Sequence, residues 1–245
     1  MRLRTLFATI AIFTLCTTVA FADSPFQVKP NEFDPGKTFL VQAAWLEGIG
    51  CPTNAKIAIP NADFSGIASF GTYSDPACAT GGDSKDKRTE GLLLVKTGPT
   101  LTNFAAAGAK LEGVKGMTLT ELGYDIRKPG ASTSDPRGSQ CDADSPRFNI
   151  TTTTGFYFLA CNSPPPDSAT AGAGWMRLRW GNGSAGSVLA SLNGQTLQPV
   201  TGEVKSIEIV FDEGQDFGPT NFGEAVLDNI DVNGTLVGRG PTDAD

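Results

Sequence analysis

Residues 203–211 read EVKSIEIVF, and this stretch decides the fold class. Ile207, Ile209 and Phe211 recur at every second position, with the charged Glu208 between two of them. A period of two sends alternate side chains to opposite faces of a β-strand. We therefore expect a strand at Glu203–Phe211 that buries these three apolar side chains in a core.

The rest of the chain repeats this pattern in short apolar or alternating runs, separated by turn residues among its 29 Gly and 16 Pro. One short helix is expected at Thr102–Ala109. Many short strands with frequent turns predict an all-β fold, an antiparallel β-sandwich of jelly-roll-like character in a single domain. The other expected strands are Thr38–Leu46, Lys56–Ile59, Gly66–Phe70, Gly91–Lys96, Ala109–Val114, Met117–Arg127, Arg147–Thr152, Phe156–Cys161, Trp175–Trp180, Ala225–Val232 and Thr235–Val237.

The chain begins with the features of an export signal. Met1-Arg2-Leu3-Arg4 is basic, Leu6–Val19 is apolar, and Ala20-Phe21-Ala22 resembles a cleavage site. We expect a signal peptide at 1–22, an extended segment at 23–37, the sandwich at 38–238 and a mobile tail at 239–245. The predicted location is secreted or periplasmic, with no membrane span after cleavage.

Four cysteines follow the predicted signal: Cys51, Cys78, Cys141 and Cys161. An even number of cysteines in an exported chain indicates disulfides, and three pairings are possible. We predict Cys51–Cys78 and Cys141–Cys161, because each bond closes a local loop rich in turn residues. A metal site of four thiolates is the alternative, which the absence of a CxxC pair disfavours.

Composition excludes several classes of function. The sequence has no His, so Ser-His-Asp catalysis and His-ligated metals are excluded. Its 19 Lys and Arg stand against 26 Asp and Glu, a net charge of −7. Nucleic-acid binding depends on cationic side chains, so this balance argues against it.

The strand Trp175–Trp180 supplies the main binding hypothesis. Alternation places Met176, Leu178 and Trp180 on one face, the better core candidate. The opposite face would then present an aromatic ring and two guanidinium groups, which suit a glycan. In the alternative, a loop covers the indole and the arginines are solvated or paired with acids. The residues of this predicted ligand site are Trp175, Arg177 and Arg179, joined by Arg127, Arg147 and Tyr157 if their strands are neighbours.

Asp228 interrupts the apolar face that Val226, Ile230 and Val232 form at a period of two. If that face is the core, the carboxylate points inward and needs a cation, hydrogen bonds or protonation. Calcium accepts such oxygen ligands. The alternative is that Asp228 accepts backbone N–H groups or meets an arginine.

Four stretches resemble a group of exported bacterial proteins of unknown function, a resemblance that implies no activity. A second similarity is to jelly-roll carbohydrate-binding modules, whose last strand often carries an Asp that binds a structural calcium. Leu227-Asp228-Asn229-Ile230 matches that element in pattern. The four stretches are Pro146-Arg147-Phe148-Asn149-Ile150, Val210-Phe211-Asp212-Glu213-Gly214, Val226–Gly234 and Glu90–Thr100.

Two function classes remain open from the sequence. The first is a non-catalytic binding module for extracellular glycan or cell-surface material. The second is a structural or interaction protein of the envelope or matrix that has no small ligand. A glycan-active enzyme comes third, because acidic turns such as Gly82–Lys87 could supply paired carboxylates.

Overall fold

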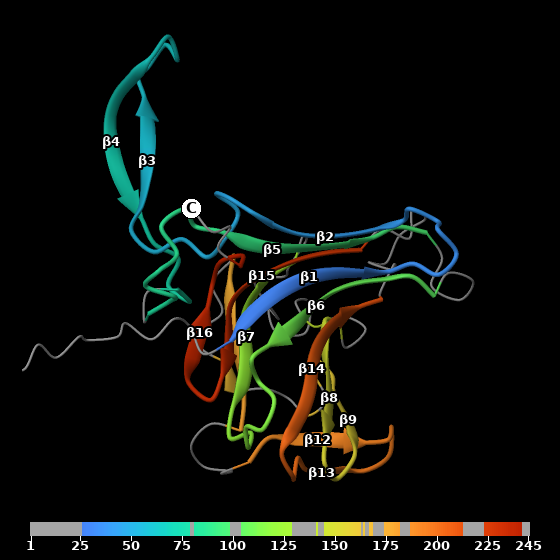
Figure 1. Ribbon diagram of the computed structural model, residues 1–245. Coiled ribbons are helices and arrows are strands. Elements are labelled where there is room, and N and C mark those ends of the chain that lie inside the picture. Colours follow the sequence, from blue (N-terminus) through green and yellow to red (C-terminus); the bar gives the residue numbers. More distant parts are fainter. Residues whose placement is uncertain are drawn as a thin grey trace, which may run out of the picture.

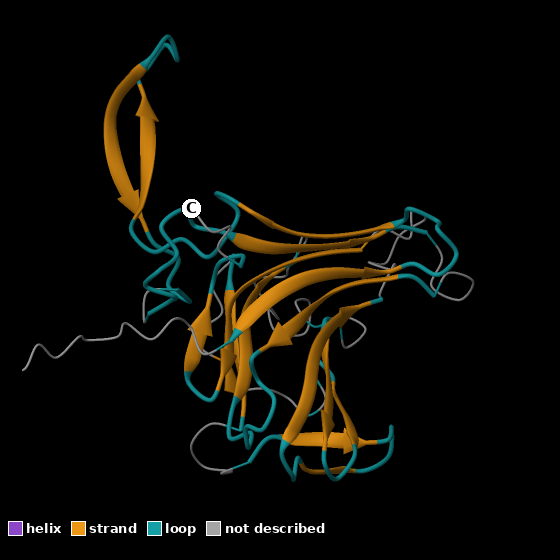
Figure 2. Cartoon of the chain, viewed as in Figure 1, coloured by secondary structure: helices purple, strands orange, loops and turns teal. Residues whose placement is uncertain are grey.

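The computed structural model is built of antiparallel strands, and the part of the chain that it describes contains no helix (Figures 1 and 2). None of the described segments forms a helix long and apolar enough to cross a membrane. The described residues are 26–78, 81–98, 104–128, 141, 145–162, 164, 167–168, 174–181, 187–212 and 223–241. The predicted signal peptide lies outside them.

Two seven-stranded sheets and one separate hairpin make up the fold. The first sheet has the order β1 (Gln27–Phe33), β6 (Ala106–Glu112), β14 (Val204–Phe211), β8 (Arg147–Thr152), β9 (Phe156–Leu159), β12 (Leu189–Leu192), β13 (Leu197–Pro199). The second has the order β10 (Asp167–Ser168), β11 (Met176–Trp180), β7 (Leu122–Arg127), β15 (Gly223–Val232), β5 (Gly91–Lys96), β2 (Val41–Leu46), with β16 (Thr235–Val237) paired to β15. The hairpin pairs β3 (Ala55–Pro60) with β4 (Ile67–Tyr73).

The core lies between the two sheets. Ile207, Ile209 and Phe211 of β14 are at most 1% exposed, as the alternation of this stretch predicts. From the second sheet, the Tyr124 ring packs against Phe148 of the first, with centroids 5.4 Å apart. Residues of both sheets belong to one buried cluster, so the fold is a β-sandwich.

The order of the strands is jelly-roll-like, because the chain crosses repeatedly between the sheets. It passes from β5 to β6, on to β7 and then to β8, changing sheet each time, and it crosses again from β14 to β15. Both predicted disulfides, Cys51–Cys78 and Cys141–Cys161, are present. The fold class and the cysteine pairing are therefore confirmed.

Three local predictions are wrong. Residues 106–109, expected in a helix, belong to β6, where Ala107 and Ala109 are buried at a period of two between β1 and β14. Strand β1 lies within the segment expected to precede the sandwich, so the sandwich begins before residue 38. The strand expected at Met117–Arg127 covers only Leu122–Arg127.

A β-bulge in β15 reverses the expected pattern of faces around Asp228. Pairing with β7 shifts between Asp228 and Asp231, and Asn229 has a φ of 46°. Leu227 and Ile230 both lie in the main core as a result. Of the three apolar residues expected beside it, only Val226 shares a face with Asp228, and that face is the outer one, turned away from the first sheet.

Candidate functional site

The outer face of the second sheet is covered by chain around Trp175. This indole, just before β11, is 3% exposed and packs with Cys51, Cys78 and Val226. The loop that carries the Cys51–Cys78 disulfide thus lies against it. The expectation of an accessible face here is wrong, and the covered arrangement given as the alternative is the observed one.

Arg177 and Arg179 are paired with carboxylates of the protein. Arg177 donates to both oxygens of Asp125 at 2.8 and 2.9 Å, and Asp125 is fully buried. Arg179 lies 2.9 Å from Asp231 and 3.4 Å from Asp125. The hydrogen bond to Asp125 raises the pKa of Arg177, whereas burial lowers the pKa of Arg179. Pairing offsets the desolvation of these buried charges.

Asp228 joins the last long strand to the start of the domain. Its Oδ2 accepts the backbone N–H of Cys51 at 2.6 Å, and its Oδ1 accepts that of Asn229. Burial raises the pKa of Asp228 well above its usual range, and the charges of Asp125 and Asp86 act in the same direction. Asp228 thus accepts backbone N–H groups, the arrangement given above as the alternative to a calcium ion.

The carboxylates beside Asp228 are engaged with backbone groups. Asp228 borders a cavity of about 290 Å³ together with Asp83 and Asp86. Asp83 and Asp86 accept backbone N–H groups of their own loop. Across the described ranges, no group of three or more acidic or thiol side chains is arranged to hold a metal ion. The calcium role of Asp228 stays a prediction.

The remaining predicted ligand residues are divided between the sheets. Arg147 lies on β8 of the first sheet and donates to both oxygens of Asp212 at 2.6 Å. Tyr157, on β9 of the same sheet, is 2% exposed, and its hydroxyl bonds Thr201. Arg127 and Trp175 line one cavity, of about 630 Å³. The six residues therefore do not form one site.

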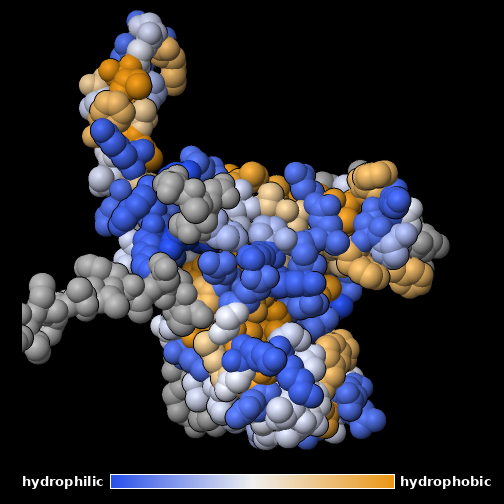
Figure 3. Space-filling model, viewed as in Figure 1, coloured by the Kyte–Doolittle hydropathy of each residue, from blue (hydrophilic) through white to orange (hydrophobic). Residues whose placement is uncertain are grey.

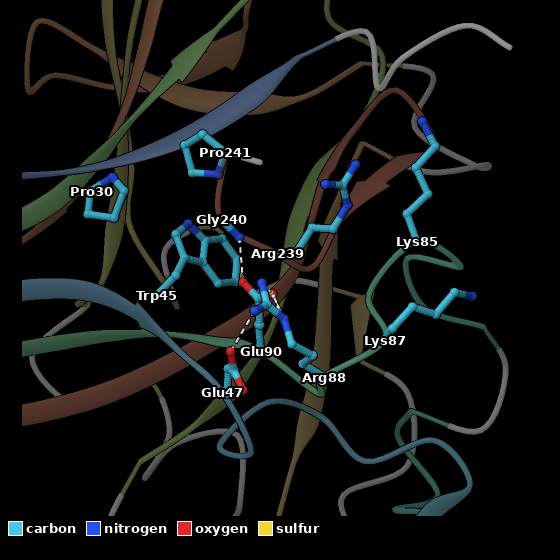
Figure 4. A pocket seen from close by; sticks show the side chains of 10 residues that line it. All are labelled: Pro30, Trp45, Glu47, Lys85, Lys87, Arg88, Glu90, Arg239, Gly240 and Pro241. Atoms are coloured by element: carbon cyan, nitrogen blue, oxygen red, sulfur yellow. Dashed lines mark hydrogen bonds and ion pairs between the residues drawn. The ribbon is translucent and has the colours of Figure 1, made fainter. Parts of the chain in front are cut away.

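A different pocket opens where four parts of the chain meet (Figure 4). These parts are β1, β2 with the turn after it, the loop before β5, and the segment after β16. The cavity has a volume of about 720 Å³, within the range of small-molecule sites. Its lining residues are Pro30, Trp45, Glu47, Lys85, Lys87, Arg88, Glu90, Arg239, Gly240 and Pro241. We call it the Trp45 pocket.

The indole of Trp45 is fixed in the wall of this pocket. It lies on β2, at the edge of the second sheet, and its Nε1 donates to the carbonyl of Val28 on β1 at 2.9 Å. The backbone of Gly240 passes close to the indole, where an added Cβ would lie 3.3 Å from Trp45 Cγ. The ring is half-buried and held by both neighbours, so it offers a preformed apolar surface.

Arg88 and Glu90 hold the walls of the pocket together. Arg88 donates to Glu90 Oε1 at 3.1 and 2.9 Å and to Glu47 at 2.6 Å. The other oxygen of Glu90 accepts the backbone N–H of Gly240 at 2.9 Å. Residues 239–241, expected in a mobile tail, are thus attached to the sandwich, and 242–245 lie outside the described residues.

The charge of the pocket is opposite to that of the whole protein. Four cationic side chains and two carboxylates line it, whereas the full chain has a net charge of −7. Both carboxylates interact with Arg88. Cations gathered in a concave site of an acidic protein raise the local concentration of anionic ligands.

This pocket is not apparent from the sequence. Trp45 lies within a predicted strand, and nothing in that strand marks its ring as accessible. The run Gly82–Lys87 has the pattern of an acidic turn, although Lys85 and Lys87 are the members that line the pocket. Comparisons with protein-family models, with curated proteins and with solved structures found no match. Any assignment of function therefore depends on this geometry.

Proposed function

We propose that the protein is a non-catalytic binding module for an extracellular glycan that carries acidic groups, and that the ligand occupies the Trp45 pocket. The observation that carries the proposal is the combination of a fixed indole with an excess of cationic side chains in one concavity. Aromatic rings stack on the apolar faces of sugars, and cations attract carboxylate or sulfate groups.

Different residues of the pocket would stack on the sugar ring and attract its acidic groups. Trp45 supplies the stacking surface on one side of the pocket, and Lys85, Lys87 and Arg239 line the other side with positive charge. Arg239 Nε also lies 3.6 Å from Asp83 Oδ2, and this ion pair orients the guanidinium group. Binding to partly exposed cations weakens as salt rises, so the affinity for an acidic glycan should fall with ionic strength.

The carboxylates support binding rather than hydrolysis. Glu47 and Glu90 both accept hydrogen bonds from Arg88, and the other oxygen of Glu90 accepts the backbone N–H of Gly240. A glycosidase needs one of its two carboxyl groups to donate a proton. In this arrangement Glu47, which is 63% exposed, is suited to accept hydrogen bonds from sugar hydroxyls.

The two disulfides indicate an oxidising, extracytoplasmic compartment. Secretion by way of residues 1–22 is part of the proposal. Such a compartment is where extracellular polysaccharides are found, so location and ligand class agree.

An array of neutral and acidic glycans tests the proposal. The protein should be retained by uronate-containing or sulfated glycans and not by their neutral counterparts. Retention of neutral glycans alone would contradict the role of the cations. An array on which nothing binds would contradict the glycan ligand altogether and leave the structural or interaction role as the remaining class.

A further inference from the structure

The β3–β4 hairpin stands away from the sandwich (Figures 1 and 2). In the described part of the chain its two strands pair only with each other. The base of the hairpin is fixed, because the Cys51–Cys78 disulfide brackets it and Asn54 N donates to Ser74 Oγ at 2.7 Å. We call residues 55–73 the arm.

The arm exposes an unusual amount of apolar surface (Figure 3). Six large side chains are between 43% and 82% exposed. A two-stranded hairpin is at best marginally stable by itself in water, and a contiguous apolar patch marks an interaction surface. The arm is therefore expected to be covered by a partner. The exposed side chains are Ile57, Ile59, Phe64, Ile67, Phe70 and Tyr73.

Strand β4 is the more open of the two edges of the arm. Its sequence IASFGTY contains no charged residue and no proline. Proteins usually protect an exposed edge strand with lysine or proline, and β3 has both, at Lys56 and Pro60. An edge without such protection is a template for another strand.

We propose that β4 pairs antiparallel with β4 of a second copy of this chain, forming a four-stranded sheet across a twofold axis. Full overlap of Ile67–Tyr73 with its copy places Phe70 of one chain opposite Phe70 of the other. The same register places each Ile67 opposite Tyr73. Aromatic pairs and pairs of an aromatic with a β-branched residue are favourable across antiparallel strands.

The charges favour a second copy over a lipid surface. The arm carries one cation, Lys56 near its base, and one anion, Asp63 at its tip. Antiparallel pairing brings the tip of one arm toward the base of the other, so opposite charges approach one another. It also keeps the two acidic sandwiches at opposite ends of the paired arms. A single lysine on a chain of net charge −7 gives little attraction to anionic lipid.

Cysteine cross-linking tests the register. Phe70→Cys should give a covalent dimer under mild oxidation, because residues on the twofold axis face each other. Thr72→Cys is the matched control, since Thr72 is exposed on the same strand but off the axis, and this variant should give no covalent dimer. Equal cross-linking of both variants, or of neither, would overturn the proposal.

Mass measurement in solution tests the association without a cross-link. The full chain should form dimers as its concentration rises. Phe70→Lys and Phe70→Glu should each be monomeric, because like charges would lie directly opposite, and an equimolar mixture should restore the dimer. Monomeric protein at all concentrations would contradict a second copy as the partner. Co-sedimentation of the native protein with phosphatidylcholine–phosphatidylglycerol vesicles, in place of dimer formation, would contradict it as well.

Discussion

At the scale of single residues, the outer face of the second sheet is defined by buried charge. Asp125, Asp228 and Asp231 are each at most 2% exposed. Two of them face arginines, and the third accepts backbone N–H groups. Substitution of one member of this cluster should destabilise the fold, because it leaves another buried polar group unpaired.

Asp228→Ala should lower the free energy of unfolding by about 1–3 kcal/mol, because the N–H groups of Cys51 and Asn229 lose their acceptor. Chemical denaturation measures this loss. Melting with and without a chelator separates the calcium prediction from the hydrogen-bond role. A fall in Tm on chelation that the variant lacks would confirm calcium. If the Tm of the native protein is the same with and without chelator, the metal is ruled out. If Asp228→Ala has the same Tm as the native protein, both roles are contradicted.

Glu121 gives the fold a pH dependence. Burial, reinforced by Asp231, raises the pKa of Glu121 from 4.5 to about 7. Between these values the folded state binds more protons than the unfolded state, so this group's contribution makes the free energy of unfolding fall as pH rises. Glu121→Gln should remove that contribution, and its stability relative to the native protein should rise from pH 4.5 to 7. Glu208→Gln, at a half-buried position on the other sheet, is the control, and parallel curves for both variants would contradict the assignment.

At the scale of elements, period-two alternation predicts strands well and fails where the backbone departs from it. The alternation predicted for Ile207, Ile209 and Phe211 of β14 is confirmed, whereas a shift in pairing between Val204 and Ser206 interrupts it at the start of the strand. In β15 the same reasoning placed Asp228 toward the core, because no single sequence signal revealed the bulge at Asn229. The short Ala-rich run before Leu111 resembles a helix in composition, and only its neighbours β1 and β14 make it a strand.

The Cys51–Cys78 bond is expected to be a main support of the covered outer face. It closes a loop with a sequence separation of 27 residues, so its loss should cost about 3–4 kcal/mol on the chain-entropy model. Cys51→Ser with Cys78→Ser should also increase solvent quenching of Trp175, which packs on this bond. Unchanged stability and quenching would show that the covering loop holds without the disulfide.

At the scale of the whole molecule, the sandwich presents two separate features, the Trp45 pocket and the arm. The fold class and both disulfides could be predicted from the sequence, because strand period and cysteine number are local signals. The pocket could not, because Trp45, Arg88 and Gly240 meet only after folding, across almost 200 residues of sequence. The burial of Trp175 could not be predicted either, because the loop that covers it is distant in sequence.

The central claim is that the Trp45 pocket binds an acidic glycan. Calorimetric titration with an acidic oligosaccharide selected on the array, performed on three forms of the protein, tests it most directly. The forms are the native chain, Lys87→Gln in the pocket, and Lys205→Gln, the same change at an exposed position on β14. Native protein and Lys205→Gln should bind equally, and Lys87→Gln should bind several-fold more weakly, with the difference shrinking at high salt. Equal affinity of all three forms would contradict the account.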